Sequence, residues 1–336
     1  MTPTSRRTPV YLNVYGSRYT FGLQGDGAVP ATVDALVAYA TRHGLAGLEL
    51  PVVSARAMDR ADLRRVRDAA ERDGFGLILS SLGTEPIQLR ADIELAAALG
   101  ARVLVTAVAE TRFGGDRRHL AGQWHLLMRA VHEQIAAVVP DAEKAGVVIA
   151  LENHQDLDAL DMLSLCRALD SEAVGVTFDC ANALGVAEHP MEYLRAVLPY
   201  VVHAHMKDYR TQWTDEGYAL IRCPVGSGVV PLPELVSTIK AAKPGVAFSI
   251  EIGALVARVV RVFAEDFWAD HRPRSPAALS SLLGFVGRHA DAESTDLQTP
   301  FERATDSTDI TGYEEMELEE SIAFVLSRFD SWIRPA

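Results

Sequence analysis

The chain has 336 residues, of which 49% are apolar and 23% are charged, and its formal net charge is −13. This length and composition are typical of a globular protein with a sizeable core. The acidic balance argues against a protein that binds the phosphate backbone of DNA or RNA, and the lack of any run of about 18 apolar residues argues against a membrane span.

Eight short, mostly apolar segments recur along residues 9–253. In chain order they are PVYLNVYG (9–16), GLAGLELPV (44–52), FGLILSSLG (75–83), ARVLVTAV (101–108), GVVIALENH (146–154), VGVTFDCAN (174–182), VVHAHMKD (201–208) and VAFSIEIG (246–253). Near-continuous apolar runs of this kind, rather than alternating ones, are typical of parallel strands that are buried on both faces.

Segments with helical periodicity separate these expected strands. Examples are PATVDALVAYATRHG (30–44), QLRADIELAAALG (88–100), WHLLMRAVHEQIAAVVPDAEKAG (124–146) and PLPELVSTIKAAKPG (231–245). A strand followed by a helix, repeated eight times, predicts an α/β fold in which a (β/α)8 TIM barrel forms a single domain over residues 1–336. A doubly wound sheet is disfavoured because no GxGxxG pattern follows the first expected strand.

A long tail follows the eighth expected strand. Its last part, YEEMELEESIAFVLSRFDSWI (313–333), has helical periodicity, with acids at its start and arginine near its end as the helix dipole favours. We expect this segment to be the eighth barrel helix. Residues 254–312 would then be an insertion between strand eight and helix eight, at the C-terminal face where active sites of such barrels lie. The sequence leaves open whether the insertion is a peripheral extension, a lid or a subunit contact.

Four consecutive expected strands end in side chains that bind metal ions. They are Glu152, Asp179, His205 and Glu251. In a (β/α)8 barrel these side chains point into the mouth, where three carboxylates without a cation would repel one another. One imidazole in an oxygen-rich set suits Mn²⁺, Mg²⁺, Co²⁺ or Zn²⁺. We therefore expect one divalent metal ion, although each residue alone also has a structural explanation, such as a helix cap.

The motifs around these residues resemble those of the xylose-isomerase-like (β/α)8 superfamily of sugar isomerases and epimerases. This superfamily also contains inosose dehydratases and the endonuclease IV type of DNA-repair enzyme. The matching motifs are ALENH (150–154), TFDCAN (177–182), HAHMKD (203–208), SIEI (249–252), PVGSGVVPLPEL (224–235) and ELEESIAFV (317–325). The resemblance covers the whole barrel and leaves only the insertion without a counterpart in the simplest members.

The resemblance implies that Glu152, Asp179, His205 and Glu251 bind one divalent metal ion, most often Mn²⁺. In the ketose epimerases of the family the two glutamates also move protons at a carbon next to a carbonyl. Such chemistry is sound because a Lewis acid stabilises the enediolate, while one carboxylate removes the proton and a second returns it.

One motif departs from the ketose 3-epimerases, which follow the histidine with a glycine, a glutamate and a substrate-binding arginine. Here His205 is followed by MKDYR, which is closer to inositol-pathway and sugar-acid members. We expect Lys207 to be a catalytic group, either as a substrate clamp or as a general acid. The alternative is a structural pair of Lys207 with Asp208 or with a neighbouring carboxylate.

Other rim residues are candidates for catalysis or substrate binding. His154 lies two residues past Glu152 and is a candidate general base or a partner of a metal ligand. Asn182, Trp213 and Glu49 are candidate substrate contacts: Asn182 near the metal site, Trp213 in a mouth loop where an aromatic face stacks on a sugar, and Glu49 as a contact or proton relay. Each also has a structural alternative, such as a helix N-cap for Asn182.

Two reactions fit this site. The first is isomerisation or epimerisation of a keto-sugar by a metal-dependent enzyme. The alternative is a lyase that uses the same site for β-elimination, since the chain also resembles the α subunit of bacterial C-glycoside deglycosylases, which act on 3-keto glycosides with a small β subunit. A DNA-repair endonuclease is disfavoured because the ends of strands two to four offer no histidine, and a metal-free binding or scaffold protein is a minor alternative.

The remaining expectations concern partners and location. We expect a small carbohydrate substrate, no nucleic acid or membrane partner, and either a homo-oligomer or a complex with a small β subunit. Three cysteines without metal-type spacing, and an N-terminal sequence without the apolar region of a signal peptide, favour the cytoplasm.

Overall fold

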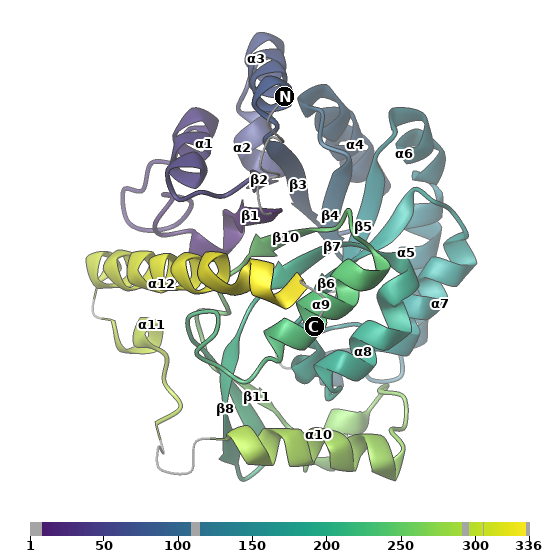
Figure 1. Cartoon of the computed structure of the whole chain (residues 1–336). Coiled ribbons are helices and arrows are strands. Elements are labelled where there is room, and N and C mark those ends of the chain that lie inside the picture. The colour runs from purple at the N-terminus through teal and green to yellow at the C-terminus, as the bar shows by residue number, and fades with distance from the viewer. Residues whose placement is uncertain (1–8, 109–114, 291–295, 305, 334–336) are drawn as a thin grey trace.

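The computed structural model of the protein describes residues 9–108, 115–290, 296–304 and 306–333. Eight parallel strands close into a barrel in the order β1-β10-β7-β6-β5-β4-β3-β2 (Figure 1). They are β1 (Val10–Asn13), β2 (Gly47–Pro51), β3 (Gly76–Leu82), β4 (Val103–Ala107), β5 (Val148–Glu152), β6 (Val174–Asp179), β7 (Val201–Met206) and β10 (Ala247–Ile250). Each lies within one of the eight segments predicted from the sequence, so the TIM-barrel prediction is confirmed.

Helices surround the barrel between its strands. They are α1 (Val33–Arg42), α2 (Val52–Arg56), α3 (Arg60–Asp73), α4 (Pro86–Leu99), α5 (Trp124–Ala136), α6 (Val139–Ala145), α7 (Ala159–Leu169), α8 (Pro190–Val197), α9 (Leu232–Ala242) and α12 (Ser307–Ile333). The predicted helix over 124–146 is divided into α5 and α6, and Pro140 lies in the first turn of α6, where its missing N–H costs nothing. Within the described ranges, none of the helices is long and apolar enough to cross a membrane.

Short 3-10 helices complete the connections. They are η1 (Tyr15–Ser17), η2 (Arg118–Leu120), η3 (Asn182–Val186), η4 (Leu198–Tyr200) and η5 (Glu265–Trp268). η1 and η3 directly follow the ends of β1 and β6, and therefore lie near the mouth of the barrel.

A second sheet leaves the barrel after β7. It is antiparallel, with the order β11-β9-β8, and contains β8 (Tyr209–Thr214), β9 (Gly217–Arg222) and β11 (Arg258–Val260). The sequence predicted a mouth loop at Trp213, but Trp213 is a strand residue of β8. Tyr209 pairs with Arg222 and Trp213 with Tyr218. Hydrogen bonds between β8 and β9 thus form strands in a segment whose apolar runs are too short to distinguish it from a loop in the sequence.

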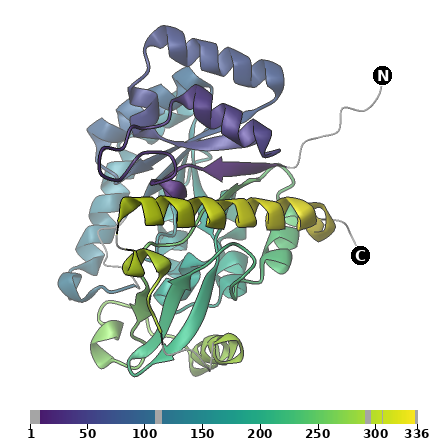
Figure 2. The same ribbon diagram turned by 90° about the vertical axis from the view of Figure 1, so that its left-hand side faces the viewer.

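The insertion supplies β11 to this sheet, together with α10 (Pro276–His289) and α11 (Pro300–Arg303). Figures 1 and 2 show the sheet and α10 together on one side of the barrel. Residues 291–295 and 305 of the predicted insertion lie outside the described residues. The eighth barrel helix, α12, begins at Ser307 rather than at residue 313, so its first turns belong to the segment that was assigned to the insertion.

Buried ion pairs join the insertion to the barrel. Arg274 contacts Asp158 at 3.2 Å, and Arg272 contacts Asp161 at 3.2 Å. Asp161 also contacts Arg117, which donates a hydrogen bond to the backbone oxygen of Asp270. Because Asp158 and Asp161 lie at the start of α7, the insertion is held against the segment that follows β5.

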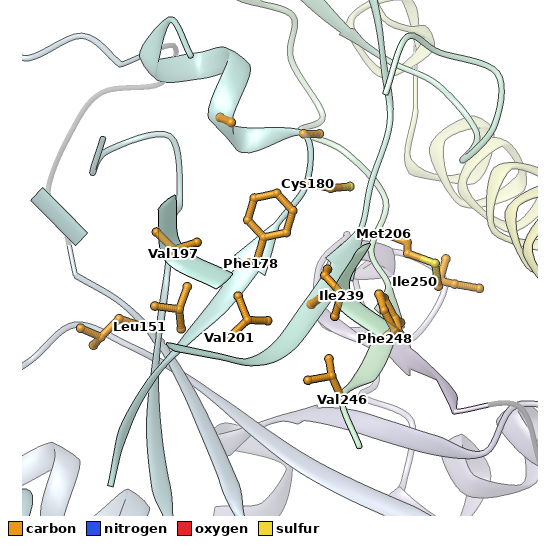
Figure 3. Close-up of a cluster of buried hydrophobic side chains, with 14 of the residues drawn as sticks. Leu151, Phe178, Cys180, Val197, Val201, Met206, Ile239, Val246, Phe248 and Ile250 are labelled. Carbon is orange, nitrogen blue, oxygen red and sulfur yellow. The ribbon is translucent and has the colours of Figure 1, made fainter. Parts of the chain in front are cut away.

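The core between the barrel and its outer helices explains how the site residues point inward. Figure 3 shows Leu151, Phe178, Met206 and Ile250 in an apolar cluster with Val197 of α8 and Ile239 of α9. Successive side chains of a strand point to opposite faces. The residues next to these four, namely Glu152, Asp179, His205 and Glu251, therefore point into the barrel. On α12, Phe329 packs against Phe248 of β10 with ring centroids 5.3 Å apart, which closes the outer layer over the first and last strands.

Candidate metal centre and active-site cavity

A cavity of about 320 Å³ opens at the C-terminal ends of the barrel strands. Three carboxylates line it, those of Glu49, Glu152 and Glu251, and His154 lies beside them. Four of the residues predicted from the sequence therefore share one cavity. Its size and mixed polar and apolar walls are typical of a site for a small molecule.

The four predicted metal ligands come together beside this cavity. One ligand atom each from Glu152, Asp179, His205 and Glu251 lies within 4.8 Å of all the others. His205 Nδ1 is 2.8 Å from Glu251 Oε2 and 3.6 Å from Glu152 Oε1. Its distance to Asp179 Oδ2 is 3.8 Å. Atoms bound at about 2.1 Å to a single ion are separated by about 3 to 4 Å, so these distances fit one metal ion.

The register of the barrel sets this arrangement. Asp179 pairs with His205 across β6 and β7, and His205 pairs with Ser249 of β10. Glu251 follows two residues later, and its N–H donates to the backbone oxygen of Met206. The side chains therefore reach the same point from strands that enter the mouth at slightly different heights.

Three atoms of this cluster are not hydrogen-bonded. Asp179 Oδ2, His205 Nδ1 and Glu251 Oε2 are buried, and none has a partner of hydrogen-bond geometry in the described part of the chain. They lie within ion-pair distance of one another or of Lys207. Buried polar atoms without partners are costly, and metal coordination is one way to satisfy them. The donor set thus fits a divalent cation.

A second group of titratable side chains lies deeper and shares His205. His205 Nε2 is 3.0 Å from Glu49 Oε2, and His203 Nε2 is 3.0 Å from the same oxygen. His203 also contacts the oxygens of Ala247 and Ser249, both at 3.0 Å. This group could also hold an ion by its geometry, but its atoms already bond to one another. We therefore assign it the role of orienting His205, with Nε2 toward Glu49 and Nδ1 toward the cavity.

Burial and neighbouring charges shift the pKa values of Glu49 and His205 in opposite directions. Burial alone would raise the pKa of Glu49, but the imidazoles of His205 and His203 outweigh it and lower that pKa below the usual range. Burial alone would lower the pKa of His205, but Glu49, Glu251 and Glu152 raise it well above its ordinary value. The charges therefore stabilise one another in the barrel mouth.

Lys207 and Asp208 point in different directions. Lys207 Nζ lies 2.5 Å from Asp179 Oδ2 and 3.0 Å from Glu251 Oε2. Despite burial, which lowers it, the pKa of Lys207 is raised well above its ordinary value by these carboxylates. Asp208 instead accepts hydrogen bonds from the N–H groups of Gly226, Gly228 and Val230, each at 3.0 Å. A structural pair between Lys207 and Asp208 is therefore wrong, whereas a structural pair with a neighbouring carboxylate, the other form of that alternative, agrees with the contacts to Asp179 and Glu251.

This role of Asp208 also explains one of the glycines before α9. A Cβ at Gly228 would lie 2.2 Å from Asp208 Oδ1, so no larger residue fits there. Burial raises the pKa of Asp208 to about 6, although the backbone donors oppose this. The lysine of the HxKD motif thus faces the metal ligands, while the aspartate orders the loop behind them.

Two amide side chains support the ligands. Asn153 accepts a hydrogen bond from the N–H of Asp179 and donates one to its backbone oxygen, at 2.8 and 2.9 Å. Asn182 is buried; its Nδ2 lies 3.5 Å from Glu152 Oε1 and its Oδ1 accepts from Gln155. Asn182 is therefore placed behind Glu152 and is not among the residues that line the cavity.

The loop after β5 places His154 on the cavity wall. Gln155 has a φ of 62°, in the left-handed region that a residue with a side chain rarely adopts. The N–H of His154 donates to Asp156 Oδ1 at 3.0 Å, which helps to hold the turn. Backbone strain of this kind is often found next to functional residues.

Trp213 lies apart from this site. It belongs to β8, stacks on Phe263 with ring centroids 5.9 Å apart, and is 40% exposed. It is not among the residues that line the cavity. A substrate would have to extend beyond the cavity to reach it.

Comparison with known proteins identifies the family. A family model described as xylose isomerase-like TIM barrel matches residues 37–265, which is more than half of the chain. The chain belongs to the xylose isomerase-like TIM barrel family. The family assignment agrees with the resemblance found in the sequence.

Two curated relatives match part of this family member. YihM, an uncharacterised protein of Escherichia coli (strain K12), is 24% identical over 234 residues, or 68% of this chain and 67% of YihM. A 3-oxo-isoapionate decarboxylase of Pectobacterium atrosepticum is 26% identical over 188 residues, or 55% of this chain and 64% of that enzyme. The chain thus spans about two thirds of the length of these relatives.

Solved structures share the fold of this xylose isomerase-like barrel. One is a xylose isomerase-like protein of Mycobacterium smegmatis in complex with magnesium, with 18% identity and a TM-score of 0.56 over 83% of this chain and 98% of that one. Another is the 3-keto-D-glucoside 4-epimerase YcjR of E. coli, with 14% identity and a TM-score of 0.54 over 84% of this chain and 99% of that one. At these identities the likeness concerns the fold.

Some residues of the xylose isomerase-like site were not found by sequence reasoning. Arg56 and Tyr15 line the cavity, and Asn153 clamps the backbone of Asp179. Arg56 comes five residues after the end of β2. A charged residue so soon after a barrel strand is the one signal that could have indicated it.

Proposed function

We propose that the protein is a divalent-metal-dependent enzyme that removes a proton from the carbon next to the carbonyl of a keto-sugar, most directly as an isomerase or epimerase. The observation that carries the proposal is the cluster of four ligand atoms within 4.8 Å of one another, three of them without hydrogen-bond partners, beside a cavity sized for a small molecule.

The metal ion would be held by Glu152, Asp179, His205 and Glu251. We propose Mn²⁺, with Mg²⁺, Co²⁺ or Zn²⁺ as alternatives, because this set combines three carboxylates with one imidazole. When bound, such an ion supplies a Lewis acid that polarises the carbonyl and stabilises the negative charge of the enediolate.

Glu152 and Glu251 are the proposed proton-transfer groups. Both line the cavity, and they come from β5 and from the end of β10, which are separated in the barrel by β6 and β7. One carboxylate takes the proton from carbon and leaves an enediolate. Return of a proton to the other face of the same carbon gives an epimer, and return to the former carbonyl carbon gives an isomer.

The remaining site residues have supporting roles in this proposal. His154 faces the cavity and moves protons to and from the substrate hydroxyls. Lys207 is the proposed general acid or charge partner beside Glu251, at 3.0 Å. Glu49 and Asn182 position His205 and Glu152. Trp213 would contact a substrate only beyond the cavity.

The names of two relatives support a keto-sugar substrate. One relative is named for 3-oxo-isoapionate and another for a 3-keto-D-glucoside, so each name places a keto group on the substrate. The magnesium in the M. smegmatis structure supports a divalent ion in this fold. All three statements belong to those proteins, and our proposal extends them to this chain.

Proton exchange tests the proposal directly. Protein loaded with Mn²⁺ is incubated in D₂O with a panel of ketohexoses and keto-sugar acids, and NMR detects deuterium at the carbon next to the carbonyl. We expect exchange with the loaded protein at a rate at least about 100-fold above that of chelator-treated protein. An inactive loaded protein across the whole panel would contradict the proposal.

Variants of the two glutamates complete this test. Glu152→Gln and Glu251→Gln should each abolish exchange while circular dichroism and the melting temperature show a folded barrel, because glutamine keeps the side-chain shape and removes the base. Glu94→Gln, on the outer helix α4, is a control that should exchange at the wild-type rate. Exchange at the wild-type rate in either site variant would contradict the proton-transfer role.

A second candidate function uses the same site for elimination. Tyr15, Val53 and Leu82 line the cavity and are 44%, 56% and 70% exposed, so one wall is unusually apolar for a free sugar. Such a wall favours a lyase that cleaves a 3-keto C-glycoside and holds its aglycone, with a small β subunit as partner. Release of free aglycone from such a substrate, without interconversion of ketohexoses, would decide for the lyase.

The proposed assembly and location are the same for either reaction. We propose a homo-oligomer or a complex with the β subunit, in the cytoplasm, and we propose that the insertion is the lid or the contact. Light scattering of the purified protein, alone and with the candidate subunit, tests the assembly.

A further inference from the structure

A cation lines the cavity in addition to its carboxylates. Arg56, at the end of α2, lines the cavity together with Glu49, Glu152 and Glu251. It is the only arginine or lysine that lines this cavity in the described part of the chain. The cavity therefore combines carboxylates from β2, β5 and the end of β10 with one guanidinium from α2.

A buried carboxylate fixes Arg56 in this place. Asp92 of α4 is completely buried, and its Oδ1 lies 2.5 Å from Arg56 Nη2. Asp92 also accepts hydrogen bonds from Gln88 Nε2 at 3.0 Å and from Ser81 Oγ at 2.6 Å. With three donors around it, Asp92 is well stabilised and holds one edge of the guanidinium firmly.

The rest of the guanidinium remains available to a ligand. The Arg56 side chain is 39% exposed, and within the described residues its Nε and Nη1 have no hydrogen-bond partner. An outer arginine gives a useful contrast. Arg90 of α4 is 45% exposed and paired with Asp141 in a similar way, but it also donates to the backbone oxygen of Ala137 and lies away from the cavity.

We propose that Arg56 is the binding site for a carboxylate of the substrate, so that the substrate is a keto-sugar acid. This inference rests on the proposed function and names the substrate class of the same site. The carbonyl end of the sugar lies at Glu152 and Glu251, and its carboxylate end lies at Arg56. A planar carboxylate accepts two parallel hydrogen bonds from a guanidinium fork.

The charge of the site favours a carboxylate over a phosphate. A phosphate ester is close to a dianion at neutral pH, whereas the cavity offers a single arginine that already shares its charge with Asp92. A single carboxylate matches the charge and the two parallel donors of one guanidinium.

Matched ligands separate the acid from the sugar. Isothermal titration calorimetry of the Mn²⁺-loaded protein compares 5-keto-D-gluconate with L-sorbose, its neutral counterpart in which the carboxylate is replaced by CH₂OH. A second pair is 2-keto-D-gluconate and D-fructose, and D-fructose 6-phosphate represents the phosphate. We expect at least one keto acid to bind about 10- to 100-fold more tightly than its neutral partner, which is the range of a hydrogen-bonded charge pair.

Variants assign the preference to Arg56. Arg56→Met should remove the 10- to 100-fold preference for the acid while the affinity for the neutral ketose changes less than about twofold. Arg56→Lys should keep part of the preference, and Arg90→Met is the control that should keep all of it. Melting temperatures show that each variant folds.

The outcomes are distinct. Equal binding of acid and neutral sugar, no binding of either keto acid, or a preference that survives in Arg56→Met would each overturn the proposal, and tighter binding of the phosphate ester would overturn its choice of carboxylate. Proton exchange is read separately. A keto acid that binds through Arg56 but exchanges no proton contradicts the proposed function alone, whereas exchange of neutral ketoses without any preference for acids contradicts this inference alone.

Discussion

Two groups of titratable side chains meet at His205 and differ in whether their polar atoms are hydrogen-bonded. Glu49 and His203, on the Nε2 side of His205, are fully buried and bond to each other and to the barrel backbone. On the Nδ1 side, His205 Nδ1, Asp179 Oδ2 and Glu251 Oε2 are buried and have no hydrogen-bond partner in the described chain. One imidazole thus separates a group whose polar atoms are hydrogen-bonded within the protein from a group whose polar atoms are held by ionic contacts.

The difference supports the proposed position of the active site in this barrel. Both groups are charged and buried, so neither burial nor charge alone identifies the site. What distinguishes them is that the atoms of the first group satisfy one another, while those of the second converge on a single point beside a cavity. A cluster of polar atoms without partners is costly in a folded protein, and such a cost persists where ligand binding offsets it.

The largest expected effect comes from removing one proposed metal ligand on the Nδ1 side of His205. Asp179→Asn should weaken Mn²⁺ binding more than about 100-fold, because the ion loses a charged ligand, which exceeds the effect of changing a residue behind a ligand. Calorimetry measures the affinity, with Asp141→Asn on the outer surface as the control. One-to-one binding with wild-type affinity in Asp179→Asn would show that the ion, if any, binds elsewhere.

The next effect is on stability. Mn²⁺ at about 100 times its dissociation constant should raise the free energy of unfolding by about 2.7 kcal/mol, since the ion binds the assembled cluster and not the unfolded chain. Urea denaturation with and without a chelator measures the difference. Asp179→Asn should lose this gain, and an equal gain in that variant would contradict the assignment.

The group on the Nε2 side of His205 is tested through Glu49. Glu49→Gln should weaken Mn²⁺ binding by about 10- to 100-fold, because His205 loses the carboxylate that fixes its orientation and makes it more basic. Ser249→Ala is the matched control, since Ser249 contacts His203 but not His205 in the described contacts. If both variants bind Mn²⁺ equally well, the deeper group has only a packing role.

The last effect concerns a buried acid outside both groups that already has a cationic partner. Glu188 lies 3.4 Å from Arg274 of the insertion, and burial raises its pKa from 4.5 to about 7 in spite of that arginine. Because the folded protein holds this proton more tightly than the unfolded chain, the contribution of Glu188 to stability is fully present below about pH 4.5 and is lost as the pH rises through about 7.

Glu188→Gln removes this titration. The free energy of unfolding of the wild type, relative to the variant, should therefore fall by about 3 kcal/mol between pH 4.5 and pH 8. Urea denaturation across this range gives the difference. A difference that grows with pH would show that the ion pair with Arg274 lowers the pKa of Glu188 more than burial raises it. Burial would then not control the titration of this acid.

Much of the barrel and of its metal centre could be predicted from local patterns. Each of the eight strands is a short apolar run, and four of them end in a residue whose strand neighbour is a large apolar side chain, as in Leu151 before Glu152. Alternation along a strand sends the apolar member outward and the polar member inward. Because parallel strands of a barrel all end at the same face, polar ends on successive strands must meet.

Other features depend on partners far away in the chain. Lys207 and Asp208 are neighbours in sequence, yet one turns to Glu251 and the other to the N–H groups of Gly226 and Gly228. Trp213 lies in a strand because β9 pairs with it, and Arg56 is held at the cavity by Asp92 on another helix. No local periodicity encodes such contacts, so the sequence could not indicate them.

The sequence by itself determined the barrel, its strand ends and the identity of the four convergent ligand residues, since these follow from hydrophobic period and chain direction alone. The tertiary structure decided which atoms of those residues have no hydrogen-bond partner among the described residues, that Glu49 and His203 complete the other side of His205, and that Arg56 lines the same cavity as Glu152 and Glu251. The physical reason is that alternation and direction are properties of one strand, whereas the satisfaction of a polar atom depends on every element that surrounds it.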